Sequence, residues 1–223
     1  MPHWYPVMLR LDGRDCLVAG GGEVAERKTE GLLQAGASVT VVSPSATRRL
    51  SEWAAEGRVR WLAREAAGAD VEGAALVFAA TDNPSANRMI ADAARALGIP
   101  VNVADDGEAG DFLVPATVRR GDLILTASAS GAGPAFASRI AGELAEAYGP
   151  DYEDLVKTLK EIRLLVKAEV PDASERRALL RAAAGDEAIA MWRSREGMAD
   201  KPRMLEALRR IANRRGSATE TNG

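Results

Sequence analysis

Cysteine and histidine are almost absent from this chain of 223 residues, which contains one of each. Cys16 has no second cysteine with which to form an intramolecular disulfide, so the sequence suits a reducing compartment. His3 stands near the start of the sequence, where we expect little order. We therefore predict no histidine base, no histidine metal ligand and no metal site.

Long apolar runs and a strong excess of one charge are also missing. No apolar run is long enough to span a bilayer, and we see no basic-plus-apolar leader, so we expect a cytoplasmic protein without a membrane partner. The net charge is −3, which favours neither nucleic acid nor an anionic membrane surface. The apolar share of 47% and the charged share of 27% indicate an ordinary globular chain.

The most informative stretch joins a short apolar run, residues 16–19, to three glycines, Gly20, Gly21 and Gly22. The spacing Gly20-x-Gly22-x-x-Ala25 fits the dinucleotide fingerprint G-x-G-x-x-G/A. The first glycine permits a tight turn, the second lets a pyrophosphate approach the backbone, and the following helix N-terminus attracts phosphates. We predict a dinucleotide site here. The alternative is a glycine-rich turn without a ligand.

Strands and helices alternate over the first half of the chain, a pattern typical of a parallel sheet with helices on both faces. The expected strands are residues 5–11, 16–19, 38–42, 59–62, 74–80 and 100–104. The expected helices are residues 23–35, 46–56 and 84–97. We therefore predict an α/β fold with a Rossmann-like, doubly wound parallel sheet.

The end of the predicted second strand departs from the usual dinucleotide fold, where an acidic residue holds the ribose hydroxyls. Here the chain continues Ser43-Pro44-Ser45. Arg48 and Arg49 follow and are available to a 2′-phosphate, although a solvated helix face is the interpretation that we prefer. The residues alone leave the choice between NAD and NADP open.

Polar residues also follow two later strands. Thr81 and Asp82 come directly after residues 74–80, where we expect them to line the cofactor crevice. The alternative for Asp82 is helix capping, since either Asp82 or Asn83 can cap the next helix. Asp105 and Asp106 come after residues 100–104. A carboxylate facing the nicotinamide can take the proton that leaves as the hydride departs, and its neighbour raises its pKa by repulsion. The alternative for Asp105 is a turn residue.

The alternating pattern stops near residue 112. Residues 112–118 and 123–127 read as an antiparallel hairpin joined by residues 119–122, and a helix is expected over residues 134–148. Ser128 begins the loop before that helix, where it either caps the helix or contributes to a second anion site. Four further helices are expected at residues 151–169, 174–184, 186–195 and 202–214.

Many residues along the first 150 positions resemble the precorrin-2 dehydrogenase and sirohydrochlorin ferrochelatase family, the N-terminal module of siroheme synthases. The resemblance runs in order through short motifs rather than through the glycines alone. The motifs are Tyr5-Pro6, Gly13-Arg14, Gly20-Gly21-Gly22-x-Val24-Ala25-x-Arg27-Lys28, Gly36-Ala37, Ala79-Ala80-Thr81-Asp82, Val101-Asn102-Val103-x-Asp105, Asp111-Phe112-x-x-Pro115 and Arg120-Gly121. The helical end agrees in length and character.

The resemblance implies oxidation of precorrin-2 to sirohydrochlorin with NAD, followed in some members by insertion of iron to give siroheme. It implies a homodimer, with an NAD-binding domain at residues 1–112, a dimerisation segment at 113–149 and a helical domain at 150–215. We expect a disordered tail at 216–223.

The resemblance also implies roles for individual residues. The family's NAD contacts fall on Glu23, Val24, Pro44 and Ser45, beside the three glycines and Thr81, and its key aspartate falls on Asp105. We expect Ser128, Arg119 and Arg120 to hold the carboxylates of the tetrapyrrole substrate. Ferrous iron is a second expected substrate.

A regulatory module that senses NAD or NADP without turnover is the alternative function. Such a module would be expected to carry an acidic residue after the second strand and an output domain. The first is absent, and we see no basic recognition helix.

Overall fold

The computed structural model describes residues 4–104, 109–130, 133–193 and 201–220. The chain forms two compact units, residues 1–114 and 115–223. None of the helices in these residues is both long and apolar enough to cross a membrane.

The first unit contains a sheet of five parallel strands in the order β3-β2-β1-β4-β5. This order and the intervening helices confirm the predicted Rossmann-like fold. The strands are β1 (Asp15–Ala19), β2 (Ser38–Val42), β3 (Arg60–Leu62), β4 (Leu76–Ala79) and β5 (Val101–Val103). The helices are α1 (Glu23–Gln34), α2 (Arg48–Ala55), the short 3₁₀ helix η1 (Gly68–Val71) and α3 (Pro84–Ala96).

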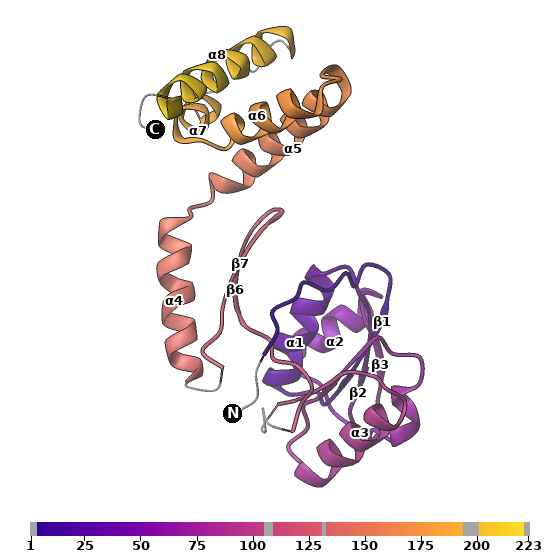
Figure 1. The fold of residues 1–223 in the computed structure, drawn as a ribbon. Helices are drawn as coiled ribbons and strands as arrows, with labels where there is room; N and C mark the ends of the chain where they lie inside the picture. The colour runs from indigo at the N-terminus through magenta and orange to yellow at the C-terminus, as the bar shows by residue number, and fades with distance from the viewer. Residues whose placement is uncertain (1–3, 105–108, 131–132, 194–200, 221–223) are drawn as a thin grey trace. The chain divides into compact units, whose positions relative to one another are not determined.

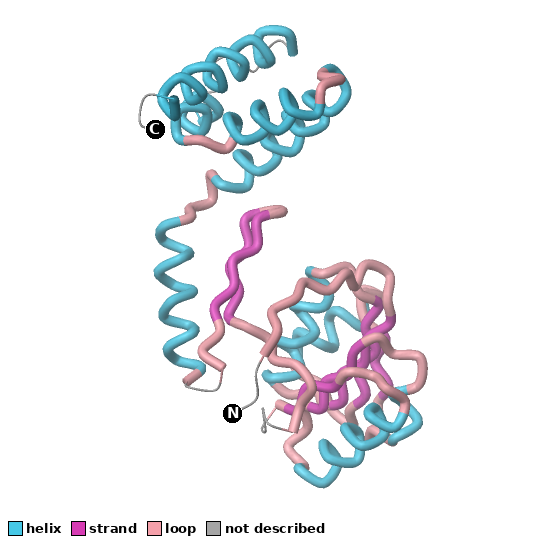
Figure 2. The backbone as a smooth tube through the Cα atoms, in the orientation of Figure 1, coloured by secondary structure: helices cyan, strands magenta, loops and turns pink. Residues whose placement is uncertain are grey.

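Both faces of this sheet are covered, because alternate residues of a strand point to opposite faces. In β1, Cys16 and Val18 pack in a core with α1 and α2, whereas Leu17 and Ala19 pack in a second core with α3. Figure 2 shows the strands with helices on both sides. Burial raises the pKa of the Cys16 thiol, which keeps it protonated and unreactive.

The segment before β1 corrects one prediction. Residues 5–11 form no strand, and Tyr5 is 86% exposed. Met8 is 67% exposed, and Leu11 is buried at the edge of the core. An apolar stretch pairs only where a sheet edge lies beside it, and β3 and β5 are the edge strands of this sheet.

The second unit begins with the predicted hairpin, with shifted ends. Strand β6 (Ala116–Arg120) pairs antiparallel with β7 (Leu123–Ala127), so the turn is the pair Gly121-Asp122 rather than residues 119–122. Gly121 adopts the positive φ of +56° that a two-residue hairpin turn requires. Helix α4 (Pro134–Ala147) runs alongside the hairpin and contacts both of its strands (Figure 1).

The rest of the second unit is helical, as predicted. Its helices are α5 (Tyr152–Glu169), α6 (Ala173–Ala183), α7 (Asp186–Arg193) and α8 (Lys201–Glu220). They bury one core, in which Ile162 and Leu208 are fully enclosed and the indole N–H of Trp192 donates to the Ala183 carbonyl oxygen at 3.0 Å. Helix α8 continues to residue 220, which corrects the predicted disordered tail over residues 216–220; residues 221–223 lie outside the described residues.

Candidate functional site

The three glycines at the end of β1 have three different surroundings. Gly20 has φ +126°, and a Cβ there would overlap the carbonyl oxygen of Ala80. A Cβ on Gly21 would overlap the carbonyl oxygen of Ser45. A Cβ on Gly22 would meet nothing within 4 Å. Gly20 and Gly21 therefore allow the chain to fold tightly, while Gly22 leaves its outer side open for a ligand to approach the backbone.

Helix α1 begins at this open side. Gly22 is its N-cap and no side chain caps it, so the first N–H groups of the helix remain available to an anion. Glu23 and Val24 are exposed in the first turn. The glycine cradle and the uncapped helix fit the pyrophosphate of a dinucleotide such as NAD, which these residues would hold through backbone N–H groups.

The loop after β2 packs directly on the glycine loop. The Thr47 N–H donates to the Gly21 carbonyl oxygen at 2.9 Å, and the Gly20 N–H donates to the Val42 carbonyl oxygen at 2.9 Å. Pro44 and Ser45 are exposed in this loop. The predicted cofactor residues on β1, on α1 and after β2 are thus brought together at the carboxyl edge of the sheet.

Thr81 lies at the same edge, after β4, and is held by a residue that the sequence reasoning missed. The buried Asn87 side chain accepts from the Thr81 N–H at 3.0 Å and from its hydroxyl at 2.7 Å, and donates to its carbonyl oxygen at 2.9 Å. Asn83, rather than Asp82, caps α3. A buried asparagine inside an otherwise apolar helix face was the available signal, because a buried amide requires partners.

The remaining predicted site residues lie either outside the described residues or in the second unit. Asp105, the predicted catalytic residue, and Asp106 lie outside the described residues. Arg119, Arg120 and Ser128 belong to the second unit. Arg119 and Ser128 are exposed, and the Ser128 hydroxyl accepts from the Ser130 N–H at 3.4 Å.

The Arg120 side chain connects the hairpin to the end of α4. Its Nε donates to the Tyr148 carbonyl oxygen at 2.9 Å, and one terminal nitrogen donates to the Ala145 carbonyl oxygen at 3.0 Å. These carbonyls belong to the last turn of α4, where helix oxygens lack partners within the helix. Arg120 therefore ties the end of α4 to the hairpin. Its other terminal nitrogen donates to the Arg119 carbonyl oxygen at 3.0 Å, so three of its five donors are used.

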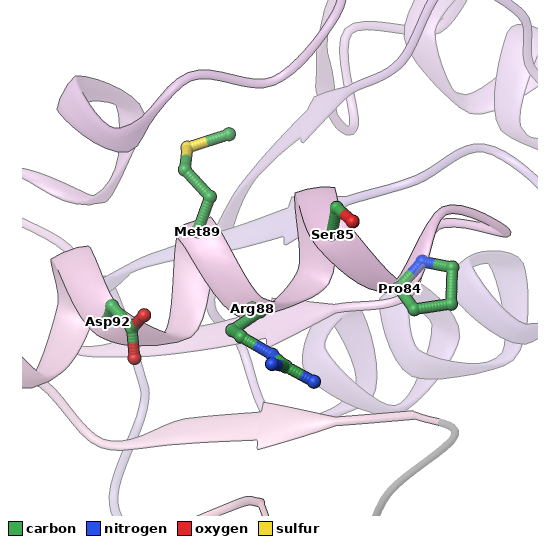
Figure 3. Close-up of a pocket in the computed structure, with 5 residues that line it drawn as sticks. All are labelled: Pro84, Ser85, Arg88, Met89 and Asp92. Carbon is green, nitrogen blue, oxygen red and sulfur yellow. The ribbon is translucent and has the colours of Figure 1, made fainter.

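A separate pocket of about 480 Å³ lies on α3, lined by Pro84, Ser85, Arg88, Met89 and Asp92. Figure 3 shows that one helix supplies all five residues and that Met89 and Arg88 point in different directions, so no group of side chains converges on a common point. Among the described residues, no group of three or more histidine, cysteine, aspartate or glutamate side chains is placed to hold a metal ion.

Comparisons with known proteins agree with this geometry. Residues 7–116 match a family described as putative NAD(P)-binding. Siroheme synthase of Methylobacillus flagellatus is 41% identical over 172 residues, which cover 77% of this chain and 37% of that protein. Siroheme synthase 1 of Halorhodospira halophila is 34% identical over 209 residues, which cover 92% of this chain and 43% of that protein. The chain thus spans about two fifths of the length of these relatives.

A solved structure covers more of the chain. SirC, a precorrin-2 dehydrogenase, superposes with a TM-score of 0.74 at 29% identity, over 93% of this chain and 100% of that one.

Proposed function

We propose that this chain oxidises precorrin-2 to sirohydrochlorin with NAD as the hydride acceptor. The chain belongs to the precorrin-2 dehydrogenase family, to which the siroheme synthases are also related. The observation that carries the proposal is the open glycine cradle at the uncapped start of α1. The structural similarity to SirC, a precorrin-2 dehydrogenase, over the whole of that chain supports precorrin-2 as the substrate.

The bound NAD would supply the hydride acceptor, and the protein's own residues would position the reactants and remove a proton. We propose that the pyrophosphate lies over Gly20–Val24 and is held by the backbone N–H groups of residues 21–24, since the Gly20 N–H already donates to Val42. Pro44, Ser45 and Thr81 are proposed to border the rest of the cofactor. Asp105 is proposed as the base that takes the proton. Arg119 and Ser128 are proposed contacts for the substrate carboxylates. Arg120 is a further proposed contact, through the guanidinium N–H groups that do not bond to α4.

Two finer features belong to this proposal. Ferrous iron is proposed as a second substrate, inserted into sirohydrochlorin to give siroheme. We also propose that the protein acts in the cytoplasm. The rival interpretation, a regulatory module that senses NAD or NADP, is not favoured, because the matched relatives are siroheme synthases and SirC is a precorrin-2 dehydrogenase.

A homodimer formed through residues 113–149 is expected. The hairpin has only two strands, and Phe136 on α4 is 53% exposed, so this segment presents both unpaired strand edges and apolar surface. Light scattering at micromolar concentration should give a mass twice that of the 23.6 kDa chain. The variant Phe136→Glu should shift the equilibrium towards the monomer, whereas Glu146→Gln, a change at an exposed polar position of the same helix, should not. A parent that is monomeric throughout would contradict the dimer.

The proposed activity is tested by incubating the purified protein with precorrin-2 under anaerobic conditions and following the absorption spectrum. Sirohydrochlorin should accumulate only when NAD is present, and added ferrous iron should convert it to siroheme faster than in the absence of protein. Accumulation of sirohydrochlorin without iron insertion would make the chain a dehydrogenase alone. Binding of NAD without any consumption of precorrin-2 would favour the regulatory module.

A further inference from the structure

A groove of about 670 Å³ lies between the first turns of α1 and the length of α2. It opens beside the glycine loop, because two of its lining residues are bonded to that loop. The Thr47 N–H donates to the Gly21 carbonyl oxygen at 2.9 Å, and the Glu26 N–H donates to the Gly22 carbonyl oxygen at 2.9 Å. The groove therefore adjoins the proposed pyrophosphate site and the end of the loop that follows β2.

The groove lies beside the end of β2, where a Rossmann fold usually recognises the adenosine ribose. An acidic residue near the end of the second strand usually accepts from the 2′-hydroxyl of NAD, and an arginine there usually accommodates the 2′-phosphate of NADP. The loop after β2 supplies no acid, since it reads Ser43-Pro44-Ser45. A carboxylate that accepts from the 2′-hydroxyl must therefore come from another element.

The charges of the groove come from α1 and α2 instead. Four glutamates and two arginines line it, which gives a net charge of −2. They are Glu23, Glu26, Glu52, Glu56, Arg48 and Arg49. A dianionic 2′-phosphate entering this groove would meet more negative than positive charge, whereas a hydroxyl would find carboxylate acceptors.

The two arginines are already occupied. Arg48 pairs with Glu52 at 2.7 Å, and Arg49 pairs with Glu30 at 2.7 Å while its guanidinium lies 4.9 Å from the Trp53 ring centroid. Neither arginine is therefore left as a free positive charge for a phosphate. Exposed ion pairs of this kind are weak. The preference for NAD over NADP therefore depends more on the net charge of the groove than on either ion pair.

Glu26 is the carboxylate that the structure holds in place. The Thr47 hydroxyl donates to its Oε2 at 2.6 Å, which fixes the side chain across the groove from α1 to the start of α2. Its second carboxylate oxygen has further acceptor capacity. Glu23 stands one turn earlier on the same helix and is exposed beside Gly22.

We propose that Glu26, supported by Glu23, takes the place of the missing acid after β2 and makes this chain select NAD against NADP. This inference rests on the proposed use of NAD at the glycine loop. It assigns the specificity to α1 rather than to the end of the second strand, and it makes Arg48 and Arg49 a latent 2′-phosphate site that the surrounding carboxylates suppress.

The test compares the dissociation constants of NAD and NADP by calorimetry in the full chain, without turnover. The parent should bind NAD more tightly. The double variant Glu23→Gln/Glu26→Gln keeps the side-chain sizes and the oxygen that accepts from Thr47, and should bind NADP about tenfold more tightly than the parent does, because two negative charges near the phosphate are removed. Glu65→Gln, at an exposed position that is not among the groove residues, is the matched control and should leave both constants unchanged.

Salt gives a second measurement, because screening weakens charge repulsion. Raising the ionic strength should narrow the gap between the two cofactors in the parent and change it little in the double variant. An unchanged ratio of the two constants in the double variant, with NAD still bound by the parent, overturns this inference alone. A parent that binds neither nucleotide overturns the proposed function and this inference together.

Discussion

Replacing Gly22 with aspartate is expected to weaken NAD binding strongly and leave the fold intact. The site tolerates the side chain sterically, because a Cβ at Gly22 meets nothing within 4 Å and φ is −82°. Aspartate is also a favoured N-cap, so its carboxylate should bond to the same N–H groups that the pyrophosphate needs. Occupied donors and a like charge together should weaken NAD binding by about 100-fold or more.

Two measurements separate a loss of NAD binding from a loss of folding. Calorimetric titration with NAD should be paired with thermal unfolding, in which Gly22→Asp should be as stable as the parent or more stable. Gly22→Asn is the matched control, because it can cap the helix without charge and should lose less affinity. Gly20→Ala is unsuitable, since its Cβ would overlap the backbone of Ala80. A folded Gly22→Asp variant that binds NAD as tightly as the parent would place the cofactor elsewhere.

Changing Asp105 to asparagine is expected to stop dehydrogenation and spare cofactor binding. The substitution keeps the size and the hydrogen bonding of the side chain but removes the proposed base. Loss of a general base typically costs about 100- to 10,000-fold in rate. Dehydrogenase turnover should fall within that range in a steady-state assay with precorrin-2, while the NAD dissociation constant stays near that of the parent.

Asp106→Asn is the matched control, because it removes a neighbouring carboxylate of the same kind. It should lower turnover much less, because the proposed base is kept. Iron insertion should be measured in the Asp105 variant from sirohydrochlorin supplied directly, and a parallel loss would mean that one pocket serves both steps. Full dehydrogenase turnover in Asp105→Asn would leave Asp105 a turn residue.

The βα part of the fold was predictable because its signals are local. The apolar run at Cys16–Ala19, the three glycines and the apolar run before Thr81 each identify their element without reference to distant residues. Residues 5–11 show the limit of this reasoning. Their composition favours a strand, but strand formation also needs a free partner edge, and that depends on tertiary structure.

The hairpin shows a second limit. Its existence was predicted from two apolar runs, but its register is set by Gly121, whose positive φ places the turn at Gly121-Asp122 and so draws Arg119 and Arg120 into β6. That shift explains why Arg120 meets the end of α4. No sequence pattern ties residue 120 to residues 145 and 148, since this contact depends on how a helix packs on a hairpin.

The candidate site was likewise predicted only in part. The glycines were predicted from spacing, and their steric roles follow from the close approach of Ala80 and Ser45. The bonds between Thr81 and Asn87, and the bond from the Thr47 hydroxyl to Glu26, join separate elements and were not predicted. The roles of Asp105, Arg119, Arg120 and Ser128 stay predictions.

The most direct test of the central claim is the ratio of NADH formed to precorrin-2 consumed in one anaerobic reaction. Oxidation of precorrin-2 by hydride transfer releases two electrons to NAD, so the account predicts one NADH for each sirohydrochlorin, and no NADH when precorrin-2 is left out. Disappearance of precorrin-2 without formation of NADH, or no reaction at all with a protein that binds NAD, would contradict it.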